Sequence, residues 1–94
     1  MKITEESVSK IYDLAKEVYS GARSKGAAAE LAVSSGLMSK GSAQDYIQNF
    51  RYIMDGFVYK RTMNLAGTRV FLERINQDFG NSKLKQALEV VSAH

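Results

Sequence analysis

The sequence predicts an all-α domain, a small bundle of about five helices. Apolar residues recur at intervals of three and four along most of the chain, which is the spacing of one face of a helix. Glycines and polar capping residues separate these segments. The chain has no proline, and its longest strand-like run is the short segment 57–59. These observations favour helices throughout residues 1–94, which we expect to form a single domain.

The first helix is expected to begin after Thr4 and to end near Ser20. The Thr4 hydroxyl can accept a hydrogen bond from a backbone N–H of the first turn, and the carboxylates of Glu5 and Glu6 suit the positive end of the helix dipole. Gly21 is a natural stop. The apolar stripe of this helix consists of Val8, Ile11, Tyr12, Ala15, Val18 and Tyr19.

The second helix is alanine-rich. It is expected to begin after Arg23 or Ser24 and to end near Ser35, with Gly36 as the residue that leaves the helix. Its small side chains would let another helix approach closely. Leu37 is expected to pack back against it.

The third helix, residues 42–55, is expected to be the centre of the domain. Ser42 and Asp45 fit the capping-box pattern, in which each side chain satisfies a backbone N–H at the start of a helix. Gly56 is the predicted stop. The apolar stripe consists of Ala43, Tyr46, Ile47, Phe50 and Met54.

Two further helices are expected in the C-terminal third of the chain. Asn64 is the predicted cap of a fourth helix, which Gly80 ends. A fifth helix is expected from Asn81 or Ser82 through Val91, and its apolar pattern is still running where the sequence stops. The predicted stripe of the fourth helix consists of Leu65, Thr68, Phe71, Leu72, Ile75 and Phe79.

The composition favours a soluble globular protein, since 45% of the residues are hydrophobic and 24% are charged. No apolar run is long enough for a membrane helix, and residues 1–6 lack the apolar core of a signal peptide. We therefore expect a cytoplasmic protein without a membrane partner. Because there is no cysteine and the single histidine is His94, we expect no metal ion and no other cofactor.

Catalysis is not expected of this chain. Acid–base and nucleophilic chemistry needs paired titratable groups with shifted pKa values, and the sequence has no cysteine and no histidine within a predicted core. The acidic pairs along the predicted helices, such as Asp13 with Glu17, are better interpreted as solvated helix faces. No phosphate-binding loop of the G-x-x-x-x-G-K-[ST] type occurs. We expect neither enzyme activity nor a small-molecule substrate.

A helix-turn-helix-like unit is a possible interpretation of the second and third helices. Ala32, Gly36 and Leu37 have the spacing of the small residue, turn glycine and apolar turn residue of such motifs. The pattern then departs, because the next apolar residues come one step late, at Ala43 and Tyr46, and the turn would have to be longer. The candidate DNA-contacting residues at the start of the third helix are Ser39, Lys40, Ser42, Gln44 and Gln48, which could equally be ordinary surface and cap residues.

A second candidate surface follows the third helix. Arg51, Tyr59, Lys60, Arg61 and Asn64 combine cations with an aromatic ring and an amide, a mixture that can follow a phosphate backbone. The formal charge of +3 and the pI near 9.3 permit a polyanionic partner without requiring one. Alternatively, the tyrosine is partly core and the cations only keep the protein soluble.

Several segments also resemble a known family. Residues 42–56 (SAQDYIQNFRYIMDG), 59–62 (YKRT), 71–75 and 78–80 resemble a region ahead of the nuclease module in bacterial restriction-type HNH endonucleases, including relatives that restrict modified DNA. The resemblance extends from about residue 3 to residue 94. In that family the pattern continues further, and the catalytic histidines and zinc-binding cysteines lie later. It implies a DNA-recognition or positioning region without the nuclease module, which is either the N-terminal part of a longer protein or stands alone.

The leading hypothesis is therefore a domain that binds double-stranded DNA. The alternative is a protein-interaction or dimerisation module that uses the apolar side of the fifth helix, around Leu84, Leu88 and Val91. The two hypotheses are compatible, because a homodimer can bind paired half-sites on DNA.

Overall fold

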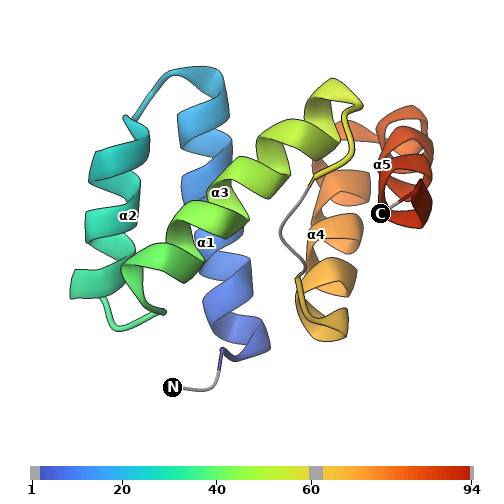
Figure 1. Ribbon diagram of the computed structural model, residues 1–94. Coiled ribbons are helices and arrows are strands. Elements are labelled where there is room, and N and C mark those ends of the chain that lie inside the picture. The colour runs from blue at the N-terminus through green and yellow to red at the C-terminus, as the bar shows by residue number, and fades with distance from the viewer. Residues whose placement is uncertain (1–2, 60–62, 94) are drawn as a thin grey trace.

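The protein is an all-α bundle, as the sequence predicts. The computed structural model describes residues 3–59 and 63–93, and within these ranges the chain forms five helices and no strand (Figure 1). None of the described helices is long and apolar enough to cross a membrane. The helices are α1 (Glu5–Ser20), α2 (Lys25–Ser34), α3 (Lys40–Asp55), α4 (Leu65–Phe79) and α5 (Asn81–Ala93).

The third helix holds the bundle together. It crosses α1 diagonally, with α2 on one side and the α4–α5 pair on the other (Figure 1). α3 packs against α1, α2 and α5, while α1 also packs against α4. Seven of its residues are buried, which leaves one side of α3 for solvent.

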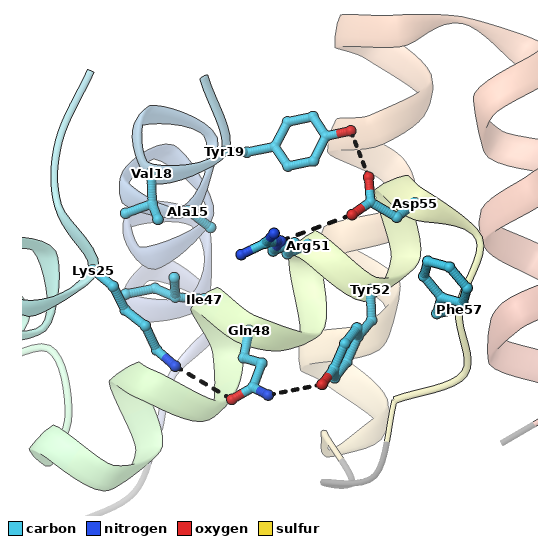
Figure 2. A pocket seen from close by; sticks show the side chains of 10 residues that line it. All are labelled: Ala15, Val18, Tyr19, Lys25, Ile47, Gln48, Arg51, Tyr52, Asp55 and Phe57. Carbon is cyan, nitrogen blue, oxygen red and sulfur yellow. Dashed lines mark hydrogen bonds and ion pairs between the residues drawn. The ribbon is translucent and has the colours of Figure 1, made fainter. Parts of the chain in front are cut away.

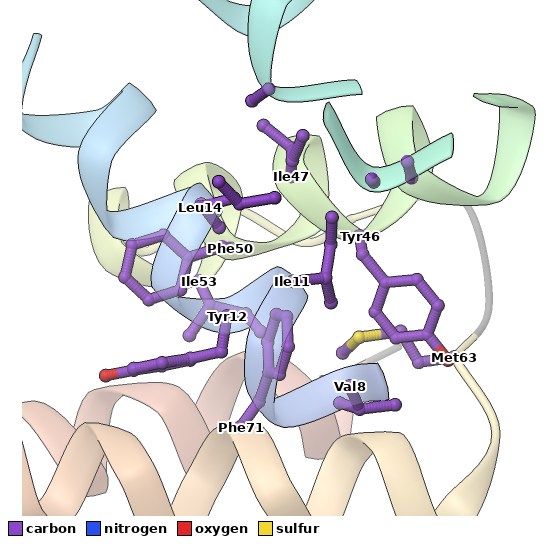
Figure 3. Packing of buried hydrophobic residues seen from close by; sticks show 14 of the residues in the cluster. Val8, Ile11, Tyr12, Leu14, Tyr46, Ile47, Phe50, Ile53, Met63 and Phe71 are labelled. Atoms are coloured by element: carbon purple, nitrogen blue, oxygen red, sulfur yellow. The ribbon is translucent and has the colours of Figure 1, made fainter. Parts of the chain in front are cut away.

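Three aromatic rings occupy the centre of the core, where α1, α3 and α4 meet (Figure 3). Tyr12, Phe50 and Phe71 come one from each of these helices. The Tyr12 ring meets the other two edge to face, with centroids 5.2 Å from Phe50 and 5.5 Å from Phe71. Aromatic pairs in this geometry contribute about 0.5–1.5 kcal/mol beyond the area that they bury. The rings therefore fix α3 against the two helices beneath it.

The predicted capping residues set both ends of α1 and the start of α2. The Thr4 hydroxyl accepts a hydrogen bond from the Ser7 N–H at 3.1 Å, and Ser24 does the same for the Ala27 N–H at 3.1 Å. Gly21 ends α1 in the left-handed region, at φ +86°. A glycine adopts this conformation at little cost because it has no Cβ.

The N-cap of the third helix lies three residues earlier than predicted. Ser39 is its N-cap, and the Ser39 hydroxyl accepts a hydrogen bond from the Ser42 N–H at 3.3 Å. The predicted capping box of Ser42 and Asp45 is therefore wrong, since both residues lie inside the helix. The earlier start extends the backbone ladder, with the Ala43 N–H donating to the Ser39 carbonyl at 2.9 Å, and Ser39 still satisfies an N–H of the first turn.

The fourth helix has the predicted cap and end, but two residues of its predicted apolar stripe lie at the surface. Leu65 is 86% exposed and Phe79 is 41% exposed, so their assignment to the buried stripe is wrong. They are the first and last residues of α4, whereas the residues nearer its middle, Phe71 and Ile75, are fully buried. The helix meets the core along its middle turns and extends past the core at both ends.

A polar cluster around Asp78 joins α1 to α4. The Tyr12 hydroxyl and the Lys16 ammonium both donate to Asp78 Oδ2 at 2.9 Å. The Arg74 guanidinium lies 4.5 Å from the Tyr12 ring centroid and binds Asp13 Oδ1 at 2.6 Å. The Lys16 ammonium lowers the pKa of Asp78, and burial raises the pKa of Tyr12, helped by its bond to Asp78.

Candidate functional site

The helix-turn-helix-like interpretation depends on three residues of the connection between α2 and α3. Ala32 and Leu37 are buried, and Gly36 adopts the left-handed conformation at φ +72°. The Leu37 N–H donates to the Ala32 carbonyl at 2.9 Å, which returns the chain to the end of α2. Five residues, 35–39, separate the two helices, so the turn is long.

One side of α3 faces solvent along its whole length. Lys40, Gln44, Gln48, Arg51 and Asp55 recur at steps of four, four, three and four, so they line one side of the helix. All of them are exposed except Gln44, which is half-buried. Four of the predicted site residues therefore share one polar side of α3, which ends in a carboxylate that the prediction did not include.

The two predicted serines are engaged in the start of the helix. Ser39 caps α3, and its hydroxyl donates to the Ser42 hydroxyl at 3.1 Å. Ser42 is half-buried. Their hydroxyls support the first turn, beside the exposed Lys40.

A groove lies between the end of α1, the start of α2 and the outward side of α3 (Figure 2). We call it the α1–α3 groove. Its volume is about 930 Å³. Arg51 lies near its centre, with Tyr19 and Asp55 on one side and Gln48 on the other (Figure 2). The lining residues are Ala15, Val18, Tyr19, Lys25, Ile47, Gln48, Arg51, Tyr52, Asp55 and Phe57.

Side-chain hydrogen bonds fix one wall of the α1–α3 groove. Lys25 Nζ donates to Gln48 Oε1 at 3.3 Å, and Gln48 Nε2 donates to the Tyr52 hydroxyl at 3.0 Å (Figure 2). This chain of contacts runs from the first residue of α2 along the outward side of α3. It holds an ammonium group and a phenol ring at the same opening.

The single carboxylate of the groove is already engaged. The Tyr19 hydroxyl donates to Asp55 Oδ1 at 2.9 Å, and Arg51 Nε lies 3.8 Å from Asp55 Oδ2. The hydrogen bond to Asp55 raises the pKa of Tyr19, and burial adds to the shift. With Lys25 and Arg51 against Asp55, the groove has one positive charge in excess.

Tyr59 and Asn64, two further predicted residues, do not join this side of α3. Tyr59 is 4% exposed and belongs to the core, so its ring is covered and cannot stack on a base in this conformation. Burial raises its pKa. Asn64 caps α4, accepting a hydrogen bond from the Gly67 N–H at 2.6 Å. Lys60 and Arg61 lie outside the described residues.

Of the ten residues that line the groove, only Gln48 and Arg51 were predicted site residues, and three of the others illustrate why. Lys25 directly follows the cap of α2, and its position gave no sign that it would reach α3. Tyr19 was interpreted as a core residue, but it is the penultimate residue of α1 and its ring lies at the groove. Phe57 follows the stop of α3 and is 64% exposed. Only the crossing of α1 and α3 brings these side chains together.

Within residues 3–59 and 63–93, no three histidine, cysteine, aspartate or glutamate side chains lie close enough together to hold a metal ion. The chain matches no known family model, and no curated protein or solved structure was found to match it. The resemblance to restriction-type HNH endonucleases stays a prediction.

Proposed function

We propose that this chain binds double-stranded DNA through the solvent side of α3. The observation that carries this proposal is the line of polar residues from Lys40 through Gln44 and Gln48 to Arg51, on a helix that follows a helix-turn-helix-like connection. Amide and guanidinium groups are the side chains that most often read base edges in the major groove. A helix of these dimensions fits that groove, which is about 12 Å wide.

Phosphate contacts in this proposal come from cations at both ends of the polar side and from the neighbouring helix. Lys40 is the first residue of α3, Arg51 lies three turns later, and Lys25 is the first residue of α2. Contacts to phosphates set the position of a protein on the duplex, while contacts to base edges give specificity. Lys60 and Arg61 are included as further phosphate-contacting cations on the basis of the sequence alone.

The experiment is a salt titration of duplex binding by fluorescence anisotropy. Each cation that contacts a phosphate contributes about one unit to the slope of log K against log salt. We expect the double variant K40A/R51A to weaken binding and to flatten this slope by about 2 units. Lys85→Ala, which removes an exposed lysine of α5, is the matched control and should change neither quantity. Equal affinity and slope in K40A/R51A and wild type would refute the assignment to α3.

The resemblance to restriction-type HNH endonucleases supports DNA as the partner and suggests the wider context. In this proposal the chain is the recognition or positioning part, and a separate nuclease module acts on the DNA. Incubation of the purified chain with plasmid DNA and Mg²⁺ or Zn²⁺ should produce binding without cleavage. Cleavage by the pure chain would refute the assignment of the nuclease activity to a separate module.

A second candidate is a protein-interaction or dimerisation module on α5. Leu88 is 45% exposed, whereas Leu84 and Val91 are half-buried. Ala87 and Val90 of the same helix are buried, so much of its apolar side already packs within the domain. A molecular mass that rises with concentration in light scattering and falls back in Leu88→Glu, without a shift by DNA, would favour this candidate.

A further inference from the structure

The α1–α3 groove has a composition that polar readout of a duplex does not require. Its lining includes aromatic rings from three segments: Tyr19 at the end of α1, Tyr52 on α3 and Phe57 after α3. Phe57 is among the most exposed apolar side chains of the described residues. The groove has a volume of about 930 Å³, which is within the range of small-molecule binding sites.

The same groove is lined by two cations, Lys25 and Arg51. Lys25 Nζ is joined through Gln48 to the Tyr52 hydroxyl, and Arg51 lies between Tyr19 and Gln48 (Figure 2). A ligand that suits this arrangement has a flat apolar part for the rings and a negative charge for Lys25 and Arg51. A nucleotide has both features, because its base has a flat π-face and its sugar carries a negatively charged phosphate.

We infer that the α1–α3 groove holds unpaired nucleotides of the bound DNA. This inference rests on the proposed function and adds a preference to it. In a paired duplex the faces of the bases are covered by their neighbours in the stack, and a protein ring can reach them only when a base is unpaired or turned out. Sites for single strands combine a positive groove with aromatic side chains in the same way.

The preference can be measured with two labelled probes of equal length, a fully paired duplex and a duplex with a central bulge of three thymidines. We expect the bulged probe to bind about tenfold more tightly, which corresponds to about 1.4 kcal/mol. Phe57→Ala should remove this preference and leave the affinity for the paired duplex unchanged, because Phe57 is off the polar side of α3. Its exposure makes the variant safe for the fold.

Two control variants separate stacking from other effects. Leu65→Ala removes another exposed apolar side chain, one that does not line the groove, and should keep the full preference. Tyr52→Phe loses the hydrogen bond to Gln48 but keeps the ring, and should keep most of the preference for the bulged probe. Circular dichroism and thermal unfolding verify that each variant is folded.

The outcomes distinguish this inference from the proposed function. Equal affinity of wild type for the two probes, or a preference that survives Phe57→Ala, overturns the groove inference and leaves duplex binding in place. Binding of the bulged probe alone supports the groove inference and overturns duplex binding through α3. Failure to bind either probe at low salt overturns both.

Discussion

One carboxylate, Asp78, joins α4 to two side chains of α1, and the substitution Asp78→Ala tests how much this contact contributes to stability. Asp78 Oδ2 accepts hydrogen bonds from the Tyr12 hydroxyl and from Lys16 Nζ, both at 2.9 Å. The Tyr12 ring is fully buried, so its hydroxyl has little freedom to find another partner. A partly buried donor that loses its acceptor costs about 1–3 kcal/mol.

The ion pair adds less than the hydrogen bond from Tyr12. The Lys16 side chain is 36% exposed, and pairs at this degree of exposure contribute about 0.2–1 kcal/mol because solvent screens them. The two effects together predict that Asp78→Ala lowers the free energy of unfolding by about 2 kcal/mol. For a chain of this size that corresponds to a fall in Tm of about 8–16 °C.

Chemical and thermal unfolding, followed by circular dichroism, measure this loss. Asp78→Asn keeps a side-chain oxygen that can accept the Tyr12 hydrogen bond, so it should cost about half as much as Asp78→Ala. Glu73→Ala is the control, because Glu73 is an exposed carboxylate of the same helix whose pair with Arg69 spans 3.8 Å. A loss in Asp78→Ala no larger than in Glu73→Ala would refute the role of the buried hydroxyl.

Further predictions concern pH, two glycines and the aromatic core. The pKa of Asp78 lies below its ordinary value of 3.8, so the ionised carboxylate stabilises the fold above about pH 4. The stability advantage of wild type over Asp78→Asn should therefore shrink as the pH falls through the folded-state pKa of Asp78. Equilibrium unfolding at several pH values measures this change. Gly56→Ala should destabilise the protein by more than about 1 kcal/mol in urea unfolding, because φ is +81°, a conformation that a residue with a Cβ rarely adopts; the Gln86 side-chain amide, 2.7 Å from the new Cβ, would only have to move aside. Gly26→Ala, inside α2 with open space around the new Cβ, should instead raise the stability by about 0.5–1 kcal/mol, and a loss there would contradict the reasoning. Phe71→Ala should cost about 3–5 kcal/mol by opening a cavity among the central rings, and a cost below about 1 kcal/mol would show that the core can rearrange.

The helices could be predicted because local signals agree with them. Thr4, Ser24 and Asn64 each cap the helix that the sequence assigned to them. The start of α3 was missed because Ser39 and Ser42 both suit a helix start, and the capping-box pattern favoured the second. Propensity alone does not distinguish two caps three residues apart.

The candidate site was only partly predictable. Lys40, Gln44, Gln48 and Arg51 share a side of α3 because helical spacing requires it. The α1–α3 groove depends on how α3 crosses α1, and this long-range packing is not encoded in any local pattern. The burial of Tyr59 has the same origin, since a tyrosine outside any helix shows no periodicity that would place it in the core.

The most direct test of binding through α3 is a titration of the ¹⁵N-labelled protein with an unlabelled duplex, followed by two-dimensional NMR. Binding through the solvent side of α3 predicts that the amide signals of Lys40, Gln44, Gln48 and Arg51 move with the added DNA, while those of α5 stay in place. The shifts should fade as salt is raised, because phosphate contacts release counterions. Shifts confined to α4 and α5, or none at low salt, would contradict DNA binding by α3.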